Sequence, residues 1–279
     1  MFPAERSVKI NELAKAIRKA TTMFIIQKTI TYKPVPNLIS IIIPAYNEEN
    51  GIRKTVEGVK KIRFSERREI IVVDDGSRDN TYNEAKKIKG IRLLKHGKNK
   101  GKAAALHTGF NAATGDVVAT IDSDCTYPPQ PIPKMLKMIR SGSADVVLGS
   151  RFYNKKRGLY ILIGAAKKIF ASLTQRKSED HTNFYGNAIF SALITMITGR
   201  RITDGSTGLR VFRKRILKDM KIKSCGLDWE VEMTTRSIRN GLNVVEIPIN
   251  YYPRVGRTKL KILNDGLRFF VGIVRGRFF

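Results

Sequence analysis

Acidic residues gather where apolar, β-branched runs give way to polar residues. Glu48 follows the run LISIII, Asp74 and Asp75 follow EIIVV, and Asp122 and Asp124 follow DVVATI. Carboxylates beside buried strands are costly unless they are paired or bind a metal, and hard oxygen ligands suit Mg²⁺ or Mn²⁺. A single acid of this kind is most often a turn or a helix cap. Because the acids recur at successive strand ends, we interpret them as one polar pocket that holds a divalent cation.

The elements that must position these acids are alternating strands and helices. Between residues 38 and 150, short β-branched runs alternate with longer helical patterns, and the pattern resumes with GLRVF, a helix near Trp229 and the run NVVEIPI. This alternation indicates βαβ crossovers and a mainly parallel, Rossmann-like α/β sheet that is buried on both faces. Since ligands bind beyond the carboxyl ends of such strands, we expect the acids at the ligand-binding edge.

Three segments differ in character from this core. Residues 1–37 are predicted to form a basic amphipathic helix, and residues 259–279 a basic amphipathic tail. The third is an apolar insertion at residues 151–200, inside the predicted main domain at residues 38–258. The longest uncharged stretch, 182–199, contains Asn, Gly, Ser and Thr, which makes it a poor bilayer crossing. We expect the chain to lie on a membrane without spanning it.

Charge and cysteine content narrow the setting. The 279 residues include 52 Lys and Arg but 24 Asp and Glu, a formal net charge of +28. The partner is therefore expected to be anionic: nucleic acid, a membrane leaflet or a phosphorylated small molecule. Cys125 and Cys225 lack the spacing of a disulfide framework or a zinc site, and no signal peptide is recognisable. These features favour a reducing, cytoplasmic location.

Seven motifs follow one another between about Leu38 and Leu260. They are IIIPAYNEEN, IIVVDDGSRDNT, KNKGKAAALHTGF, ATGDVVATIDSDCTYPP, DVVLGSR, ITDGSTGLRVF and EIPINYYPRVGRTKL. In this order they resemble the motifs of the glycosyltransferase family 2 enzymes with a GT-A fold, and among them the dolichyl-phosphate mannose and glucose synthases. Seven motifs in register are far more specific than any one of them.

The resemblance implies a role for particular residues. Asp122 and Asp124 form the metal-binding DxD pair, for Mg or Mn, although Thr126 stands where similar enzymes often have Gln. Asp124, with Arg151, Asp204 and Arg254, is expected to act in catalysis, the arginines by holding phosphates. The residues expected to bind substrate are Pro44, Tyr46, Glu48, Asp74, Asp75, Lys102, Arg257 and Lys259. The spacing leaves open whether Arg254 or Arg257 contacts the diphosphate.

Several other residues are interpreted as structural. Arg210 is expected to pair with Asp204, and His96, His107 and His181 are read as surface or hydrogen-bonded histidines. Similar enzymes with hydroxyl acceptors have an acidic base near Glu230 and Glu232. A phosphate acceptor has a second pKa of about 6 and needs little deprotonation at neutral pH, so these two acids are read as structural or orienting.

The expected activity is inverting transfer of a sugar from a UDP- or GDP-sugar to a polyprenyl phosphate such as dolichyl phosphate. The enzyme is expected to be peripheral, at the cytoplasmic face of an anionic membrane. Two alternatives stay open: transfer to a lipid or saccharide hydroxyl, with Glu230 or Glu232 as base, and a basic nucleic-acid-binding protein, which we disfavour because no recognition motif is present. The sequence does not identify the sugar or the oligomeric state.

Overall fold

A seven-stranded sheet, in the order β3-β2-β1-β4-β6-β5-β7, organises the chain. This computed structural model describes residues 37–153, 179–220, 222–224, 226–255 and 262–278. The strands are β1 (Leu38–Ala45), β2 (Arg67–Asp74), β3 (Arg92–Lys95), β4 (Val117–Thr120), β5 (Val146–Ser150), β6 (Arg210–Arg213) and β7 (Val244–Pro248). The mainly parallel α/β sheet expected from the sequence is confirmed, and its form is that of the GT-A fold.

One strand departs from the parallel pattern. β6 runs antiparallel to both of its neighbours, β4 and β5, whereas the pairs β1–β2, β2–β3, β1–β4 and β5–β7 are parallel. An antiparallel strand begins at the edge where its neighbours end. The loop that leads into β6 is therefore brought to the carboxyl ends of β4 and β5.

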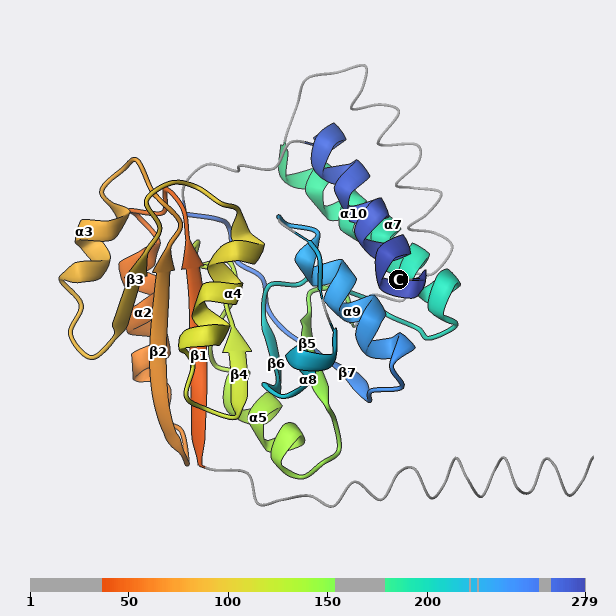
Figure 1. Ribbon diagram of the computed structural model, residues 1–279, viewed down its shortest axis with the longest axis horizontal. Helices are drawn as coiled ribbons and strands as arrows, with labels where there is room; N and C mark the ends of the chain where they lie inside the picture. Colours follow the sequence, from red (N-terminus) through yellow and green to blue (C-terminus); the bar gives the residue numbers. More distant parts are fainter. Residues whose placement is uncertain (1–36, 154–178, 221, 225, 256–261, 279) are drawn as a thin grey trace, which may run out of the picture. The chain divides into compact units, whose positions relative to one another are not determined.

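Helices cover both faces of the sheet. They are α2 (Ile52–Lys61), α3 (Thr81–Lys86), α4 (Lys102–Ala112), α5 (Ile132–Arg140), α7 (Glu179–Thr198), α8 (Ile216–Met220), α9 (Trp229–Arg239) and α10 (Ile262–Phe278). The β1–β2 and β3–β4 connections cross the sheet in opposite directions, so right-handed crossovers place α2 and α4 on opposite faces. Figure 1 draws α4 in front of β1 and β4, with α2 behind.

The burial pattern explains why these segments form these elements. Seven of the eight residues of β1 are buried, as a strand covered on both faces requires. In α2 the buried residues Ile52, Thr55, Val56 and Val59 recur at helical spacing, so that one stripe faces the sheet. On the other face Phe110, Phe212 and Trp229 form an aromatic cluster with ring centroids 5.4–6.4 Å apart.

The C-terminal helix packs tightly on α9. Gly272 and Gly276 of α10 face α9, and a Cβ atom at Gly276 would lie 2.8 Å from the Thr235 Cβ and 3.0 Å from the Glu232 carbonyl oxygen. Figure 1 shows α10 also running beside α7. No helix within the described ranges is long and apolar enough to cross a membrane.

Parts of the three special segments fall outside the described residues. The predicted helix at 1–37 lies there except for its last residue, and so do residues 154–178 of the insertion. Most of the remainder of the insertion corresponds to α7, and the basic tail to α10. The domain boundaries drawn from the sequence stay predictions.

We predict that Gly276→Ala destabilises the fold by about 1–3 kcal/mol, because the added methyl group would force α10 away from α9. The matched control is Gly266→Ala in the same helix, where a Cβ would meet no atom closer than 4.0 Å. There the change should stabilise by about 0.5–1 kcal/mol through helix propensity. Urea unfolding measures both, and equal stabilisation by the two changes would contradict the close packing.

Candidate active site at the carboxyl edge of the sheet

The acids predicted at successive strand ends do lie at one edge of the sheet. β1, β2 and β4 are parallel neighbours, and the direction of the connections reverses between β1 and β4. This reversal is the topological switch point at which α/β sheets bind ligands. Segments that follow β5 and β7, and the loop before β6, reach the same edge.

The turn that carries the two predicted metal ligands is held rigidly. Cys125 adopts a left-handed φ of 64°, which is uncommon for a residue other than glycine and marks a backbone over-determined by its surroundings. The Ser123 hydroxyl donates to the Pro44 carbonyl oxygen at 2.9 Å, and the Asp124 Oδ1 atom accepts from the Thr126 amide at 3.1 Å and hydroxyl at 2.6 Å. Thr126 thus orients Asp124.

Asp122 is positioned by a glycine from the loop before β6. A Cβ atom at Gly208 would lie 2.4 Å from the Asp122 Oδ2 atom, so only glycine leaves room for this carboxylate. Gly208 is itself fixed, because its amide donates to the Tyr127 hydroxyl at 3.1 Å and its carbonyl oxygen accepts from Thr120 at 2.9 Å. The antiparallel strand β6 is therefore what shapes the Asp122 site.

A lysine bridges Asp122 to a buried acid. The Lys102 Nζ atom, in the first turn of α4, lies 2.6 Å from the Asp122 Oδ1 atom and 2.6 Å from the Glu230 Oε1 atom. Burial disfavours the ammonium, but the two carboxylates together raise the pKa of Lys102 above its usual value. Burial raises the pKa of Glu230, against the opposing effects of Lys102 and Arg210.

An arginine after β7 closes on the other metal-binding acid. Arg254 donates to the Asp124 Oδ2 atom at 2.8 Å and also to Glu48. Its segment is held by backbone hydrogen bonds from the Tyr252 amide to the Thr126 carbonyl oxygen and from the Val255 amide to the Asp124 carbonyl oxygen, both 3.0 Å. Of the two arginines considered for this role, Arg254 is at the site, whereas Arg257 lies outside the described residues, as does Lys259.

The donor set fits a cation that is shared with a substrate. Among the described residues, no group of three or more His, Cys, Asp or Glu side chains could hold a metal. Two carboxylates, Asp122 and Asp124, suffice where phosphate oxygens and water supply the remaining ligands, as is usual for Mg²⁺. Lys102 and Arg254 occupy one oxygen of each carboxylate.

Asp74 and Asp75, at the end of β2, have different environments. The Asp74 Oδ1 atom accepts from the Ser77 amide at 3.2 Å, while its Oδ2 atom is buried without a hydrogen-bond partner in the described part of the chain. Asp75 accepts from the amides of Lys100 and Gly101 at 3.0 and 2.8 Å. Asp75 therefore holds the loop before α4, and Asp74 keeps an acceptor atom for a ligand.

His96 is hydrogen-bonded on both sides. Its Nδ1 atom lies 2.6 Å from the Asp75 Oδ1 atom and its Nε2 atom 2.8 Å from the Thr108 hydroxyl. The structural interpretation of this histidine is confirmed.

Arg151 and Asp204 form a buried pair with two parallel contacts, 2.6 Å from Nε and 2.7 Å from Nη2. Burial opposes the charged guanidinium, but Asp204 raises the pKa of Arg151 above its usual value. The guanidinium also lies 5.8 Å from the Tyr127 ring centroid and 5.3 Å from that of Tyr251. The predicted pairing of Asp204 with Arg210 is therefore wrong, because Arg151 is the partner.

Arg210 is a structural residue, as expected, although with other partners. It is fully buried and donates to the carbonyl oxygens of Thr207 and Gly205, both at 2.7 Å, and to the Thr234 hydroxyl at 2.9 Å. Burial lowers the pKa of the Arg210 guanidinium to about 10. Its donors hold the loop before β6 onto α9, and so hold Gly208 in place.

Glu246 of β7 belongs to this site but was not singled out from the sequence. Its carboxylate accepts from the Thr203 amide at 2.8 Å and from the Asp204 amide at 2.7 Å, and burial raises its pKa. The sequence feature that could have identified Glu246 is the position of an acid inside the apolar run NVVEIPI. Tyr127, whose hydroxyl accepts from Gly208, was likewise read only as part of a motif.

The remaining predicted residues have simpler places. Pro44 is buried in β1 and Tyr46 is half-buried just beyond its end. Glu232 is fully buried and contacts Ser224, Arg236 and Arg275, so it joins α9 to its neighbours and stays structural, as expected.

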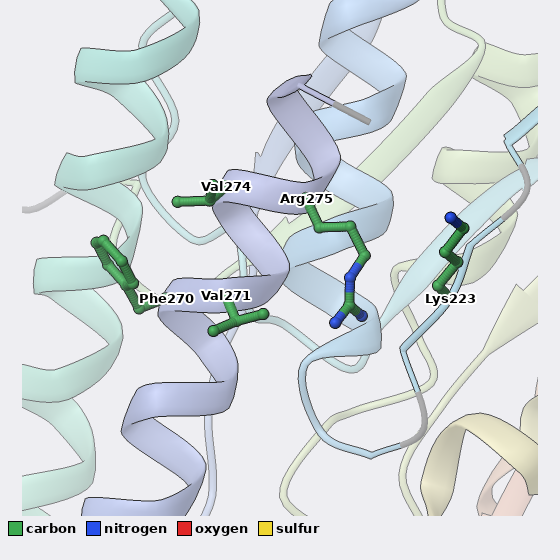
Figure 2. Close-up of a pocket in the computed structure, with 5 residues that line it drawn as sticks. All are labelled: Lys223, Phe270, Val271, Val274 and Arg275. Carbon is green, nitrogen blue, oxygen red and sulfur yellow. The ribbon is translucent and has the colours of Figure 1, made fainter.

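A pocket of about 320 Å³ lies elsewhere, on α10. Figure 2 shows Phe270 and Val274 on the side of α10 that faces α7, and Arg275 reaching towards Lys223. Val271 completes the lining, and none of these residues is among the acids of the sheet edge.

Comparisons with known proteins agree with this geometry. Residues 40–221 match the model of the family described as glycosyl transferase family 2. A low-salt glycan biosynthesis hexosyltransferase from Haloferax volcanii is 32% identical over 231 residues, 82% of this chain, but the chain spans only 51% of that protein. A dolichyl-phosphate hexose transferase from the same organism is 31% identical, with 85% of this chain and 92% of the relative covered.

A UDP-N-acetylglucosamine–dolichyl-phosphate N-acetylglucosaminyltransferase from Methanococcus voltae is 30% identical, with 76% of this chain and 84% of the relative covered. Among solved structures, glucosyl-3-phosphoglycerate synthase from Mycobacterium tuberculosis, in complex with Mn²⁺, UDP and glucosyl-3-phosphoglycerate, superposes with a TM-score of 0.59. That comparison covers 86% of this chain and 80% of the other at 18% identity, which supports the fold.

We predict that Gly208→Ala weakens Mn²⁺ binding by tenfold or more, the usual cost of losing a group that orients a metal ligand. The added methyl group would displace the Asp122 carboxylate. Electron paramagnetic resonance titration of Mn²⁺ measures the effect. The control is Gly58→Ala, where a Cβ would make an ordinary 3.6 Å contact with Pro129. Unchanged Mn²⁺ affinity in Gly208→Ala would contradict the placement of Asp122.

Proposed function

The chain belongs to glycosyl transferase family 2, and on that premise we propose that it transfers a sugar from a nucleoside diphosphate to a polyprenyl phosphate. One observation carries the proposal. Asp122 and Asp124 both follow β4 at the switch point of the sheet, and each is paired with a basic side chain that a metal–diphosphate could displace. The relatives named for dolichyl-phosphate acceptors support the acceptor class.

The donor would be held at both ends. Asp74, whose buried Oδ2 atom has no hydrogen-bond partner among the residues that the structure describes, is the acid that we assign to a base or ribose donor group. Asp122 and Asp124 would hold Mg²⁺ or Mn²⁺, which when bound stabilises the negative charge on the departing diphosphate. Arg254 and Lys102, whose cationic groups contact these two carboxylates, would move to the phosphate oxygens when the donor binds.

The acceptor requires positioning more than deprotonation. A phosphate monoester with a second pKa of about 6 is mostly a dianion at neutral pH. Its attack on the anomeric carbon, opposite the diphosphate, would invert an α-linked donor to a β-linked product. Arg151, fixed by Asp204 and flanked by Tyr127 and Tyr251, is the cation that we assign to the acceptor phosphate.

The geometry favours this acceptor over a hydroxyl group. A hydroxyl acceptor needs a base whose carboxylate can face it from an accessible site. Glu232 is fully buried among Ser224, Arg236 and Arg275, and Glu230 is only 3% exposed, with one oxygen against Lys102. Neither acid is placed as a solvent-facing base.

We also propose peripheral attachment at the cytoplasmic face of an anionic membrane. On α10 the apolar residues Leu267 and Phe270 are exposed, as is Met196 of α7, and Arg275 and Arg277 follow on α10. Apolar side chains of this kind insert at the lipid interface while Lys and Arg residues each contribute about 1 kcal/mol at an anionic surface.

We predict a lipid-linked phosphosugar when the protein is incubated with Mn²⁺ or Mg²⁺, a panel of UDP- and GDP-sugars and short polyprenyl phosphates. Mass spectrometry identifies the product. Asp122→Asn and Asp124→Asn should each lower turnover by about two orders of magnitude, as when a group that stabilises transition-state charge is lost, and a chelator should abolish it. The control is Glu57→Gln, an exposed acid on α2. Transfer of the sugar to a lipid that carries a hydroxyl group and no phosphate would contradict the assigned acceptor.

We predict that the protein floats with liposomes containing anionic lipid, and that rising salt releases it, because surface charges are screened over about 10 Å at 0.1 M salt. Replacing Leu267 and Phe270 together by Ser should lower the bound fraction at every salt concentration. Flotation that ignores both lipid charge and salt would contradict a peripheral electrostatic attachment.

A further inference from the structure

Glu230 is a buried carboxylate at a place where a carboxylate is expensive. Only 3% of the residue is exposed, and its Oε2 atom is buried without a hydrogen-bond partner among the described residues. Its other oxygen lies 2.6 Å from the Lys102 Nζ atom. A buried acid with one unsatisfied oxygen weakens a fold relative to an uncharged isostere. A role in ligand binding would explain why an acid stands here.

Lys102 is shared evenly between Glu230 and a metal-binding acid. The ammonium lies 2.6 Å from each carboxylate, with Asp122 on one side and Glu230 on the other. The lysine begins α4 and Glu230 lies in the first turn of α9, so two helices on the same side of the sheet hold the pair. The ammonium can therefore lose one partner and keep the other.

The cation of the proposed function creates a conflict at Asp122. A divalent cation and an ammonium repel each other when both contact one carboxylate. If Lys102 had no second acid, it would compete with the cation for Asp122. Arg210, a buried cation whose charge also acts on Glu230, cannot take over this role because its donors are committed to Thr207, Gly205 and Thr234.

We propose that Glu230 is a positioning residue of the donor site: it takes the Lys102 ammonium from Asp122 when the divalent cation binds, and holds it beside the diphosphate. The proposal rests on the proposed function for the identity of the donor. Glu230 thus acts through Lys102 and touches neither the metal nor the acceptor. Its Oε2 atom, which has no hydrogen-bond partner in the described part of the chain, supplies the spare acceptor that a second contact with the ammonium requires.

The test is a double-mutant cycle on the full chain with Mn²⁺ as the probe. Mn²⁺ binding is followed by electron paramagnetic resonance in the wild type, Glu230→Gln, Lys102→Met and the double variant. Glu230→Gln should weaken Mn²⁺ binding about tenfold, as is usual when a group that acts through a metal ligand is lost, because Lys102 then stays on Asp122. Lys102→Met should bind Mn²⁺ at least as tightly as the wild type, and adding Glu230→Gln to it should change the affinity less than twofold.

The control is Glu232→Gln, which removes a buried acid from the same helix at a position that contacts only structural partners. It should lower the melting temperature and leave Mn²⁺ affinity unchanged. Equal weakening by Glu230→Gln in the wild-type and Lys102→Met backgrounds would overturn the proposal, since Glu230 would then act without Lys102. No weakening in Glu230→Gln would overturn it as well.

A second measurement separates this inference from the proposed function. Calorimetric titration of UDP and of GDP at saturating Mn²⁺ should show weaker binding in Lys102→Met and, to a smaller extent, in Glu230→Gln. If the Mn²⁺ affinities of the variants follow the expected double-mutant cycle but no sugar is transferred to polyprenyl phosphate, the proposed function alone is refuted. If sugar is transferred but the effects of Glu230→Gln and Lys102→Met on Mn²⁺ affinity are additive, the positioning role alone is refuted.

Discussion

The structure depends on neutralising acids at the end of a buried sheet. Asp74, Asp122 and Asp124 follow strands covered on both faces, where an unpaired carboxylate is costly. Lys102 neutralises Asp122 and Arg254 neutralises Asp124, while one Asp74 oxygen has no hydrogen-bond partner among the described residues. The acids of the site are therefore compensated by basic side chains, which suits the polyanionic substrates that we propose.

Acids at the same edge also bind the backbone. Asp75 accepts hydrogen bonds from backbone amides in the loop before α4, and Asp124 accepts one from the Thr126 amide. Glu246 accepts one from the Asp204 amide. Each carboxylate gains charge-assisted hydrogen bonds, and each loop gains a fixed shape. Catalytic side chains on loops need such support, because a displacement of about 1 Å can cost about a hundredfold in rate.

Single-sequence reasoning located the strands and most of the site. Buried runs bounded by Asp and Gly predicted β1, β2, β4 and β5, and the strand-end rule placed their acids at one edge, as the sheet confirms. Reasoning by motif failed where partners come from distant segments. Arg151, and not Arg210, pairs with Asp204, although Arg210 is only six residues away along the chain. Glu246 was missed because a single acid in an apolar run does not indicate which residues it contacts.

The sequence by itself determined which residues could carry the chemistry and the order of strands and helices, because periodicity and turn residues are local properties. Only the tertiary structure decided which charge neutralises which. The antiparallel placement of β6 brings Gly208 against Asp122, and the meeting of α4 with α9 sets Lys102 between Asp122 and Glu230. These contacts join residues as many as 128 positions apart, from Lys102 to Glu230, and such pairings follow from packing of the sheet and helices rather than from local spacing.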